Sequence, residues 1–214
     1  MRVVVFGATG GTGRAVIARL LTAGHTVTAF SRNATRIAPS HGMTVIEGDA
    51  MVGSDVARAL AGQEAVVITL GNSQNAFALL FGARRTTPRT ICEVGTRNIL
   101  AVLPEGVRVI VVGAFGTGDT ARNRPLMFTL FFKLFLREQM ADKERQDQVL
   151  RSWGGRYTLI QPVALTDKPG TGKWTASLDG SFGKPEVSRH DLAEFIVSRL
   201  TDGDDPGGTV TFSG

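Results

Sequence analysis

Acidic residues are absent from the first part of this 214-residue chain, because no aspartate or glutamate precedes Glu47. Arginines, by contrast, recur in the same stretch. They stand at Arg2, Arg14, Arg19, Arg32 and Arg36. The segment from Met1 to Ile46 is therefore locally positive.

Cysteine is almost absent, and the single cysteine, Cys92, excludes a disulfide within the chain. One thiol suits a reducing cytoplasm. The N-terminus also lacks a charged n-region and a cleavage site, so we expect a cytoplasmic protein without a signal peptide. Cys92 falls on a predicted helix face, where we expect a small packed residue rather than a nucleophile.

Basic runs are missing as well, although the net charge is +5 and the pI is near 10. The Lys and Arg residues are scattered, without the basic and aromatic interleaving that would follow a phosphate backbone. A nucleic-acid partner is therefore not expected. No apolar stretch is long enough to predict a membrane span.

A glycine motif opens the chain, directly after the apolar residues Val3–Phe6. Gly7, Gly10 and Gly13 have the spacing G-x-x-G-x-x-G, and the amphipathic segment 14–21 follows them. A buried strand, a tight turn and a helix opening at the turn form a cradle for a phosphate. The glycines let the backbone approach the phosphate, and the N–H groups of the helix's first turn point at it. The motif therefore predicts a dinucleotide site.

The end of the second predicted strand indicates which dinucleotide binds. A site for NAD usually carries an acidic residue there for the ribose 2′-hydroxyl. This chain has Ser31, Arg32 and Arg36 instead. Arginine can hold a 2′-phosphate through charge-assisted hydrogen bonds, so the sequence favours NADP (NADPH) over NAD. In the alternative interpretation, both arginines lie on a solvated turn.

Apolar runs alternate with amphipathic segments along the chain. This βαβ order predicts an α/β fold, namely a Rossmann-type doubly wound parallel sheet with helices on both faces. Strands are expected at Thr26–Phe30, Met43–Glu47, Ala65–Leu70, Val107–Val112, Tyr157–Gln161, Lys173–Leu178 and Thr209–Phe212. Helices are expected at Asp55–Ala61, Pro88–Leu103, Glu138–Ser152 and from the Ser188 region to Leu200. The length fits one NAD(P)-binding domain over 1–214, in which residues 163–214 add a small substrate-side lobe.

Local signals mark several ends of these elements. Ser54 is a candidate N-cap for the helix that follows it. Asp179-Gly180 resembles a hairpin-type turn, and Ser188-Arg189-His190-Asp191 fits a capping box. Gly71, Asn72 and Ser73 follow a strand that is apolar along its whole length. Ligands bind at the carboxyl edge of such sheets, so Asn72 and Ser73 are candidate contacts, the alternative being an ordinary turn.

The segment from Pro125 to Leu136 is rich in Phe and Leu but is interrupted by Lys133. It is too short for a transmembrane helix. Three interpretations remain open: a buried core helix, a lid over the nicotinamide, and a face for a dimer or a membrane surface.

Several stretches together resemble the atypical short-chain dehydrogenases with NmrA-like, NAD(P)-binding folds, and within them the biliverdin IXβ/flavin reductase branch. The matching stretches are Phe6–Gly13, Val27–Arg32, Gly48-Asp49, Leu70-Gly71, Thr96–Ile99, Ala114-Phe115, Tyr157–Pro162 and Ser188–Asp191. They follow one another over nearly the whole chain.

The resemblance implies roles for individual positions. The pyrophosphate would be held by Gly7, Thr9, Gly10, Gly11, Thr12 and Gly13. The 2′-phosphate would be held by Ser31, Arg32 and Arg36, and the adenine flanked by Asp49 and Ala50. The ribose and nicotinamide would be lined by Leu70, Gly71, Asn72, Gly113, Ala114, Pro162, Val163 and Ala164.

The proton donors of these families are missing. Carbonyl-reducing short-chain dehydrogenases use Tyr-x-x-x-Lys, in which the tyrosine donates the proton. Lys143 falls at the lysine position, but the tyrosine position is Gln139, and the only tyrosine is Tyr157. The flavin and biliverdin reductases place a serine and a histidine around the substrate, where this chain has Gly113 and Ala164. The three histidines, His25, His41 and His190, are expected at the surface or in caps.

Two functional hypotheses follow. In the first, the protein is an NADPH-dependent oxidoreductase that reduces a small planar acceptor such as a flavin, quinone or tetrapyrrole. Its pocket would be lined by Asn72, Phe115, Phe128 and Lys143, with Lys143 and Asn72 as catalytic candidates. In the second, it is a non-catalytic NADP(H) sensor or interaction module. No metal site is predicted, and the chain is expected to be a monomer or a dimer.

Overall fold

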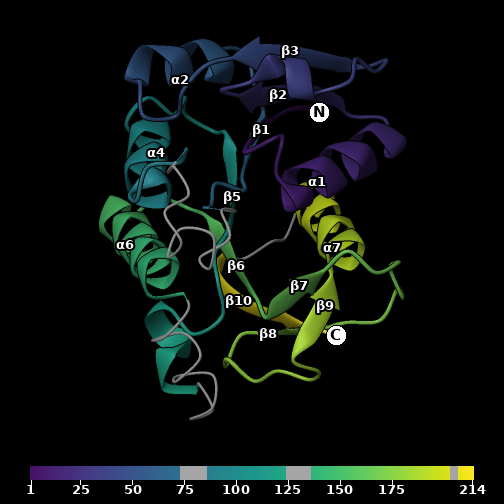
Figure 1. The fold of residues 1–214 in the computed structure, drawn as a ribbon, viewed down its shortest axis with the longest axis vertical. Helices are drawn as coiled ribbons and strands as arrows, with labels where there is room; N and C mark the ends of the chain where they lie inside the picture. Colours follow the sequence, from purple (N-terminus) through teal and green to yellow (C-terminus); the bar gives the residue numbers. More distant parts are fainter. Residues whose placement is uncertain (73–85, 124–135, 203–206) are drawn as a thin grey trace.

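The computed structural model describes residues 1–72, 86–123, 136–202 and 207–214 (Figure 1). Within these ranges, eight strands form one sheet in the order β3-β2-β1-β4-β5-β6-β10-β8. The strands are β1 (Arg2–Phe6), β2 (Thr26–Ser31), β3 (Met43–Glu47), β4 (Ala65–Ile68), β5 (Arg108–Val112), β6 (Thr158–Pro162), β8 (Thr175–Ser177) and β10 (Gly208–Ser213). Neighbouring strands run parallel, except that β8 pairs with β10 in the antiparallel direction.

Strand β1 pairs with β2 on one side and with β4 on the other. The chain first extends the sheet from β1 to β3 and then returns to extend it from β4 in the opposite direction. The strand order therefore reverses between β1 and β4, which is the place where open α/β sheets bind ligands. The expected Rossmann-type doubly wound fold is confirmed.

Helices cover both faces of the sheet (Figure 1). On one face, α1 (Gly11–Thr22) packs against α7 (Arg189–Thr201). On the other face lie α2 (Gly53–Leu60), α4 (Ile91–Ala101) and α6 (Arg137–Trp153). Two short 3-10 helices, η1 (Ala34–Arg36) and η2 (Gly118–Asn123), lie in the connections after β2 and β5. No helix in the described ranges has both the length and the apolar character needed to cross a membrane.

The core has two layers because successive side chains of a strand point to opposite faces of the sheet. From β1, Val3 and Val5 enter the layer beneath α1 and α7, whereas Val4 and Phe6 enter the layer beneath the other helices. All four side chains are fully buried. Each stabilises the fold by roughly 1.5–3 kcal/mol relative to an exposed position, which explains why this strand is apolar on both faces.

The start of α2 differs from the expectation. Ser54 is not its N-cap, because the helix begins at Gly53 after Val52, and no side chain caps it. The strand expected to reach Leu70 ends at Ile68, and the helix expected from Pro88 begins at Ile91.

The C-terminal part also departs from the expectation. Because β8 pairs with β10, the Asp179-Gly180 turn does not join two paired strands. The next strand, β9 (Glu186–Ser188), instead pairs with β7 (Ala164–Thr166) in a separate two-stranded sheet.

The predicted cap of α7 is confirmed at Ser188, whose hydroxyl accepts a hydrogen bond from the backbone N–H of His190. The acidic member of the capping box has another partner. The Asp191 carboxylate accepts hydrogen bonds from the backbone N–H groups of Thr171 and Gly172. It therefore holds the loop before β8 rather than completing the box.

An aspartate on α6 caps the neighbouring helix α4. The carboxylate of Asp142 accepts hydrogen bonds from the backbone N–H groups of Cys92 at 2.9 Å and Glu93 at 3.1 Å. These N–H groups belong to the first turn of α4, which has no partners within the helix. The Asp142 side chain is buried, and besides these donors it faces the Arg145 guanidinium at 3.7 Å and the positive end of the helix dipole.

Replacing Asp142 with alanine should lower the free energy of unfolding by about 1–3 kcal/mol, because one buried and one partly buried N–H group lose their acceptor. Asp142→Asn keeps one acceptor oxygen, so its free energy of unfolding should decrease less than that of Asp142→Ala. Urea denaturation of both variants tests this, with exposed Gln148→Ala on the same helix as the control. A loss in Asp142→Ala no larger than in the control would contradict this role.

Candidate functional site

A cavity of about 440 Å³ opens at the carboxyl edge of the sheet, where the strand order reverses. This volume lies within the range of roughly 300–1,000 Å³ that is usual for cofactor and small-molecule sites. The predicted site residues that line it are Gly7, Thr9, Gly10, Gly11, Thr12, Ser31, Arg32, Arg36, Asp49, Ala50, Leu70, Gly71, Asn72, Gly113 and Lys143. The structure thus brings together residues from six separate stretches of the chain.

Other predicted residues do not line this cavity. They are Gly13, Ala114, Phe115, Pro162, Val163 and Ala164. Phe115 is buried, and its ring meets that of Phe182 edge to face. Phe128, Ser73 and nearly all of the Phe-rich segment lie outside the described residues, so their predicted roles stay predictions.

The glycine turn after β1 depends on two close backbone approaches. Gly7 has a φ of +88°, and a Cβ on it would lie 2.7 Å from the carbonyl oxygen of Thr69. A Cβ on Gly13 would overlap the carbonyl oxygen of Gly7. Gly13 is therefore required for packing the helix against the strand, which explains why it does not line the cavity.

This packing leaves the first turn of α1 facing the cavity. Gly10 is the N-cap residue, no side chain among the described residues caps the helix, and its first turn carries no acidic residue. Its N–H groups and the positive end of the helix dipole are thus available to an anion. Thr9 lies beside this turn, and its hydroxyl oxygen is 3.4 Å from that of Ser31 at the end of β2.

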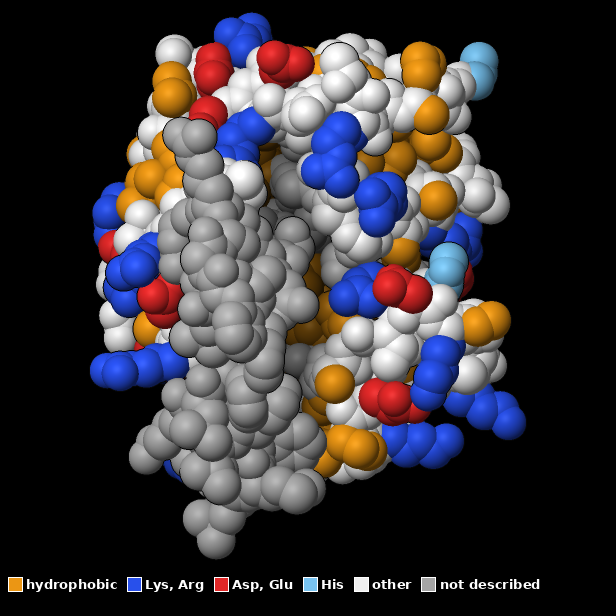
Figure 2. All heavy atoms as spheres, in the orientation of Figure 1, with side chains coloured by type: hydrophobic (Ala, Val, Ile, Leu, Met, Phe, Trp, Pro, Cys, Tyr) orange, Lys and Arg blue, Asp and Glu red, His pale blue; other side chains and the backbone are white. Residues whose placement is uncertain are grey.

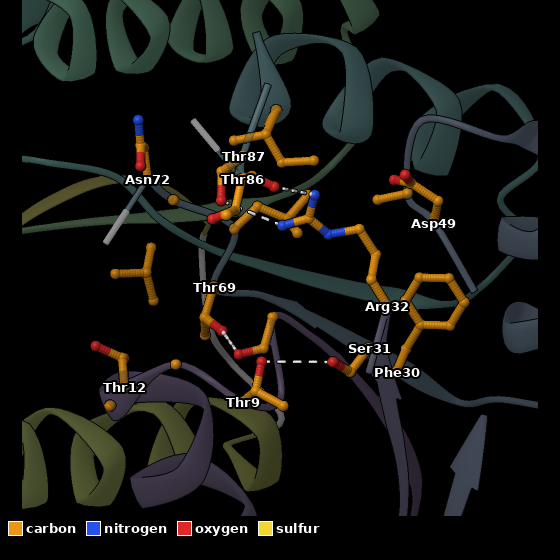
Figure 3. Close-up of a pocket in the computed structure, with 18 of the residues that line it drawn as sticks. Thr9, Thr12, Phe30, Ser31, Arg32, Asp49, Thr69, Asn72, Thr86 and Thr87 are labelled. Atoms are coloured by element: carbon orange, nitrogen blue, oxygen red, sulfur yellow. Dashed lines mark hydrogen bonds between the residues drawn. The ribbon is translucent and has the colours of Figure 1, made fainter. Parts of the chain in front are cut away.

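At the β2 end of the cavity, the Arg32 side chain points toward Thr86 and Thr87 (Figure 3). Its guanidinium donates hydrogen bonds to the carbonyl oxygen of Thr86 at 3.0 Å and to the hydroxyl of Thr87 at 3.2 Å. Arg36 lines the same end. Asp49 lies there as well, and its carboxylate accepts a hydrogen bond from the backbone N–H of Met51.

Lys143 lies at the opposite end of the cavity and is held by three acceptors. Its ammonium donates to the carbonyl oxygens of Leu70 at 2.8 Å and Val112 at 2.6 Å, and to the Gln146 side chain at 2.9 Å. An ammonium has three protons, so each of them has a partner. Lys143 therefore joins the carboxyl ends of β4 and β5 and brings a fixed positive charge to the cavity wall.

The tyrosine and histidines lie elsewhere. Tyr157 precedes β6 and packs against the apolar layer of α4 and α6. His25, His41 and His190 are absent from the described lining of the cavity, and burial lowers the pKa of His25. Gln139 lies in the first turn of α6 and is not a lining residue.

Cys92 is buried in α4, and its thiol donates to the carbonyl oxygen of Leu70 at 3.3 Å. Burial raises the pKa of this thiol to about 12, which keeps it protonated. A role as a nucleophile is therefore excluded by its environment, as the sequence suggested.

The lining residues that were not predicted as site residues are Phe30, Gly48, Thr69, Thr86, Thr87, Ile91, Val112, Leu165 and Arg189. Leu165 and Arg189 come from the C-terminal part of the chain, where Pro162, Val163 and Ala164 were expected instead. Arg189 belongs to the Ser188–Asp191 stretch, which was interpreted as a helix cap and as part of the family resemblance, but not as a contact of the cofactor. An arginine at the first position of a helix at the ligand edge is the signal that could have identified it.

The chain belongs to the NAD(P)H-binding family, whose profile matches residues 7–203. The resemblance predicted from the motifs is thereby confirmed at the level of the family. An uncharacterized chloroplastic protein from Arabidopsis thaliana is 24% identical over 206 residues, which cover 93% of this chain and 71% of that protein.

Solved structures share the fold. A short-chain dehydrogenase/reductase from Veillonella parvula in complex with NADP has a TM-score of 0.79 at 20% identity, covering 100% of this chain and 94% of its own. ChuY, an anaerobilin reductase from Escherichia coli O157:H7, has a TM-score of 0.76 at 23% identity, with 100% and 96% covered. These likenesses extend over the whole chain.

A buried polar network supports the loop that follows β5. The Asp147 carboxylate accepts hydrogen bonds from the Thr117 hydroxyl at 3.1 Å and from the Gln161 amide at 2.9 Å. The Gln161 amide oxygen in turn accepts from the Thr120 hydroxyl. Among the described residues, the second carboxylate oxygen of Asp147 has no hydrogen-bond partner.

Burial raises the pKa of Asp147 to about 6, although the Thr117 hydroxyl and the positive charges of Arg151 and Lys143 oppose this shift. Glu144 adds to the increase. The folded protein then binds the proton more tightly than the unfolded chain, so its stability decreases as the pH rises through about 6.

The variant Asp147→Asn does not titrate, so the difference between its stability and that of the wild type should depend on pH. Between pH 5 and pH 8, the wild type should lose about 1.4 kcal/mol relative to the variant. Urea denaturation at both pH values measures this change. Asp167→Asn, whose side chain is 85% exposed, is the control. A pH-independent difference for Asp147→Asn would show that Asp147 does not titrate as described.

Proposed function

We propose that the protein is an NADPH-dependent oxidoreductase that transfers a hydride to a flat, conjugated acceptor such as a flavin, a quinone or a linear tetrapyrrole. The observation that carries the proposal is a dinucleotide cradle whose described lining contains no histidine or tyrosine. A cofactor site without such a proton donor is suited to acceptors that need no proton from the protein.

The residues of the cradle fit a dinucleotide phosphate. The uncapped first turn of α1 offers N–H groups to the diphosphate, and no acidic side chain of that turn repels it. Arg32 and Arg36 supply positive charge at the end of β2, where the 2′-phosphate of NADP would lie. Their guanidinium groups and the Ser31 hydroxyl support NADP rather than NAD as the cofactor.

The chemistry of the acceptor follows from what the chain provides. A bound reduced nicotinamide supplies a hydride, which carries two electrons. An electron-poor conjugated acceptor takes this hydride and then a proton from water, so the protein mainly positions the two molecules. Reduction of a simple carbonyl would require an acid for the alkoxide, and Gln139 cannot act as one.

Similar proteins support this class of acceptor. ChuY is an anaerobilin reductase, and the chain resembles the flavin and biliverdin reductases in its motifs. Lys143 and Asn72 line the cavity and are the candidates for contacts near the reacting ring. Lys143 would act through its fixed charge and through the strand ends that it joins.

A second candidate is a non-catalytic NADP(H) sensor or interaction module. The same lack of a tyrosine or histidine in the described lining favours it. The two candidates share cofactor binding and differ in turnover, so an activity assay separates them.

NADPH oxidation should be detectable with at least one acceptor among flavin mononucleotide, menadione and biliverdin. Steady-state absorbance assays check this, and Gly10→Asp serves as a control, because a carboxylate at the helix N-terminus should repel the diphosphate. If the wild type binds NADPH but oxidises it no faster than the Gly10→Asp variant with any of these acceptors, the result would support the sensor.

Replacing both Arg32 and Arg36 with alanine should weaken NADPH binding far more than NADH binding. Each charge-assisted contact to the 2′-phosphate should contribute on the order of 1.5–3 kcal/mol. Titration calorimetry with both cofactors measures the difference, and Arg97→Ala on the surface of α4 is the matched control. Equal losses for NADPH and NADH would show that these arginines do not recognise the 2′-phosphate.

A further inference from the structure

Arg189 is the first residue of α7, and this helix lies beside α1 (Figure 1). The two helices run in the same direction, since Arg189 meets the start of α1 and Glu194 pairs with Arg19 further along. Both N-termini therefore lie at the carboxyl edge of the sheet. Arg189 thus stands next to the turn that is suited to a diphosphate.

The side chain of Arg189 occupies the space that a side chain on Gly11 would need. A Cβ on Gly11 would lie 3.0 Å from Nε and 3.1 Å from Cδ of Arg189. Gly11 is the first residue of α1, and both residues line the cavity. The absence of a side chain at Gly11 therefore lets a guanidinium lie directly against the helix N-terminus.

One ion pair orients this guanidinium. Its Nη1 donates to the Asp167 carboxylate at 2.8 Å, and the Asp167 side chain is 85% exposed. An exposed pair of this kind contributes only about 0–1 kcal/mol, so it can be rearranged at little cost. A guanidinium has five N–H donors, and the pair with Asp167 leaves others for a second anion.

The other cations of the cavity are placed differently. Lys143 directs its three protons to acceptors within the protein. Arg32 and Arg36 follow β2 and line the cavity there, and Figure 3 shows Arg32 pointing toward Thr86 and Thr87. In Figure 2, Lys and Arg side chains lie beside the hollow in the middle of the face shown. Arg189 is therefore the cation that faces the first turn of α1 from the C-terminal part of the chain.

We propose that Arg189 is a cofactor-positioning residue that donates hydrogen bonds to the diphosphate of bound NADP(H), opposite the N–H groups of α1. The planar guanidinium suits two phosphate oxygens at once. Gly11 and Asp167 assist it, the first by leaving space and the second by orienting the side chain. This inference rests on the proposed cofactor site and extends it to a residue from the C-terminal lobe.

The test compares two ligands by titration calorimetry. NADP⁺ contains both the 2′-phosphate and the diphosphate, whereas 2′-AMP contains the 2′-phosphate alone. Arg189→Ala should weaken NADP⁺ binding about tenfold to a hundredfold and change 2′-AMP binding less than about twofold. Arg32→Ala should weaken both ligands, and Arg189→Lys should retain part of the NADP⁺ affinity because it keeps the charge.

Gly11→Ala provides an independent test in a double-mutant cycle. The added methyl group should displace Arg189 and weaken NADP⁺ binding in the wild-type background, but not in the Arg189→Ala background. Thermal unfolding of each variant confirms that it is folded.

Unchanged NADP⁺ affinity in folded Arg189→Ala would overturn the inference, as would equal losses for NADP⁺ and 2′-AMP. Unchanged NADP⁺ affinity with a raised KM for an acidic acceptor would assign Arg189 to the acceptor instead. Failure of the wild type to bind NADP⁺ at all would contradict the proposed function itself, so the two failures are distinguishable.

Discussion

The site depends on how closely α1 approaches the end of β1. Gly7 and Gly13 lie so near one another that a Cβ on Gly13 would overlap the Gly7 carbonyl oxygen. This contact directs an uncapped helix N-terminus into the cavity where the strand order reverses. The apolar residues of β1 hold the strand in place from both faces of the sheet. The close packing of α1 against the end of β1 thus accounts for a helix N-terminus that is suited to an anion.

The remaining charges of the cavity are arranged around that helix end. Arg32 and Arg36 lie at the end of β2, Lys143 joins the ends of β4 and β5, and Arg189 enters from α7. These cations fit a ligand with several phosphates. The described lining of the cavity therefore combines several cations with no histidine or tyrosine, and for this reason we propose an acceptor that takes its proton from water.

The sequence was informative wherever a local rule decides the structure. The glycine spacing located the turn after β1, and the apolar runs located the parallel strands, because these features depend on neighbouring residues. It failed where distant segments meet. The hydrogen bonds of Lys143, the cap that Asp142 provides for α4, and the position of Arg189 over Gly11 all join residues far apart in the chain. Ser54 looked like a cap, but the helix begins before it.

We propose that the protein holds NADPH and lets its hydride pass directly to a conjugated acceptor. Single-turnover kinetics with NADPH deuterated on either face of the nicotinamide C4 test this most directly. We expect that deuterium on one face alone slows the oxidation of bound NADPH with a primary isotope effect, because the site holds a single orientation of the ring. Bound NADPH that stays unoxidised with every acceptor, or loss of label from both faces equally, would contradict it.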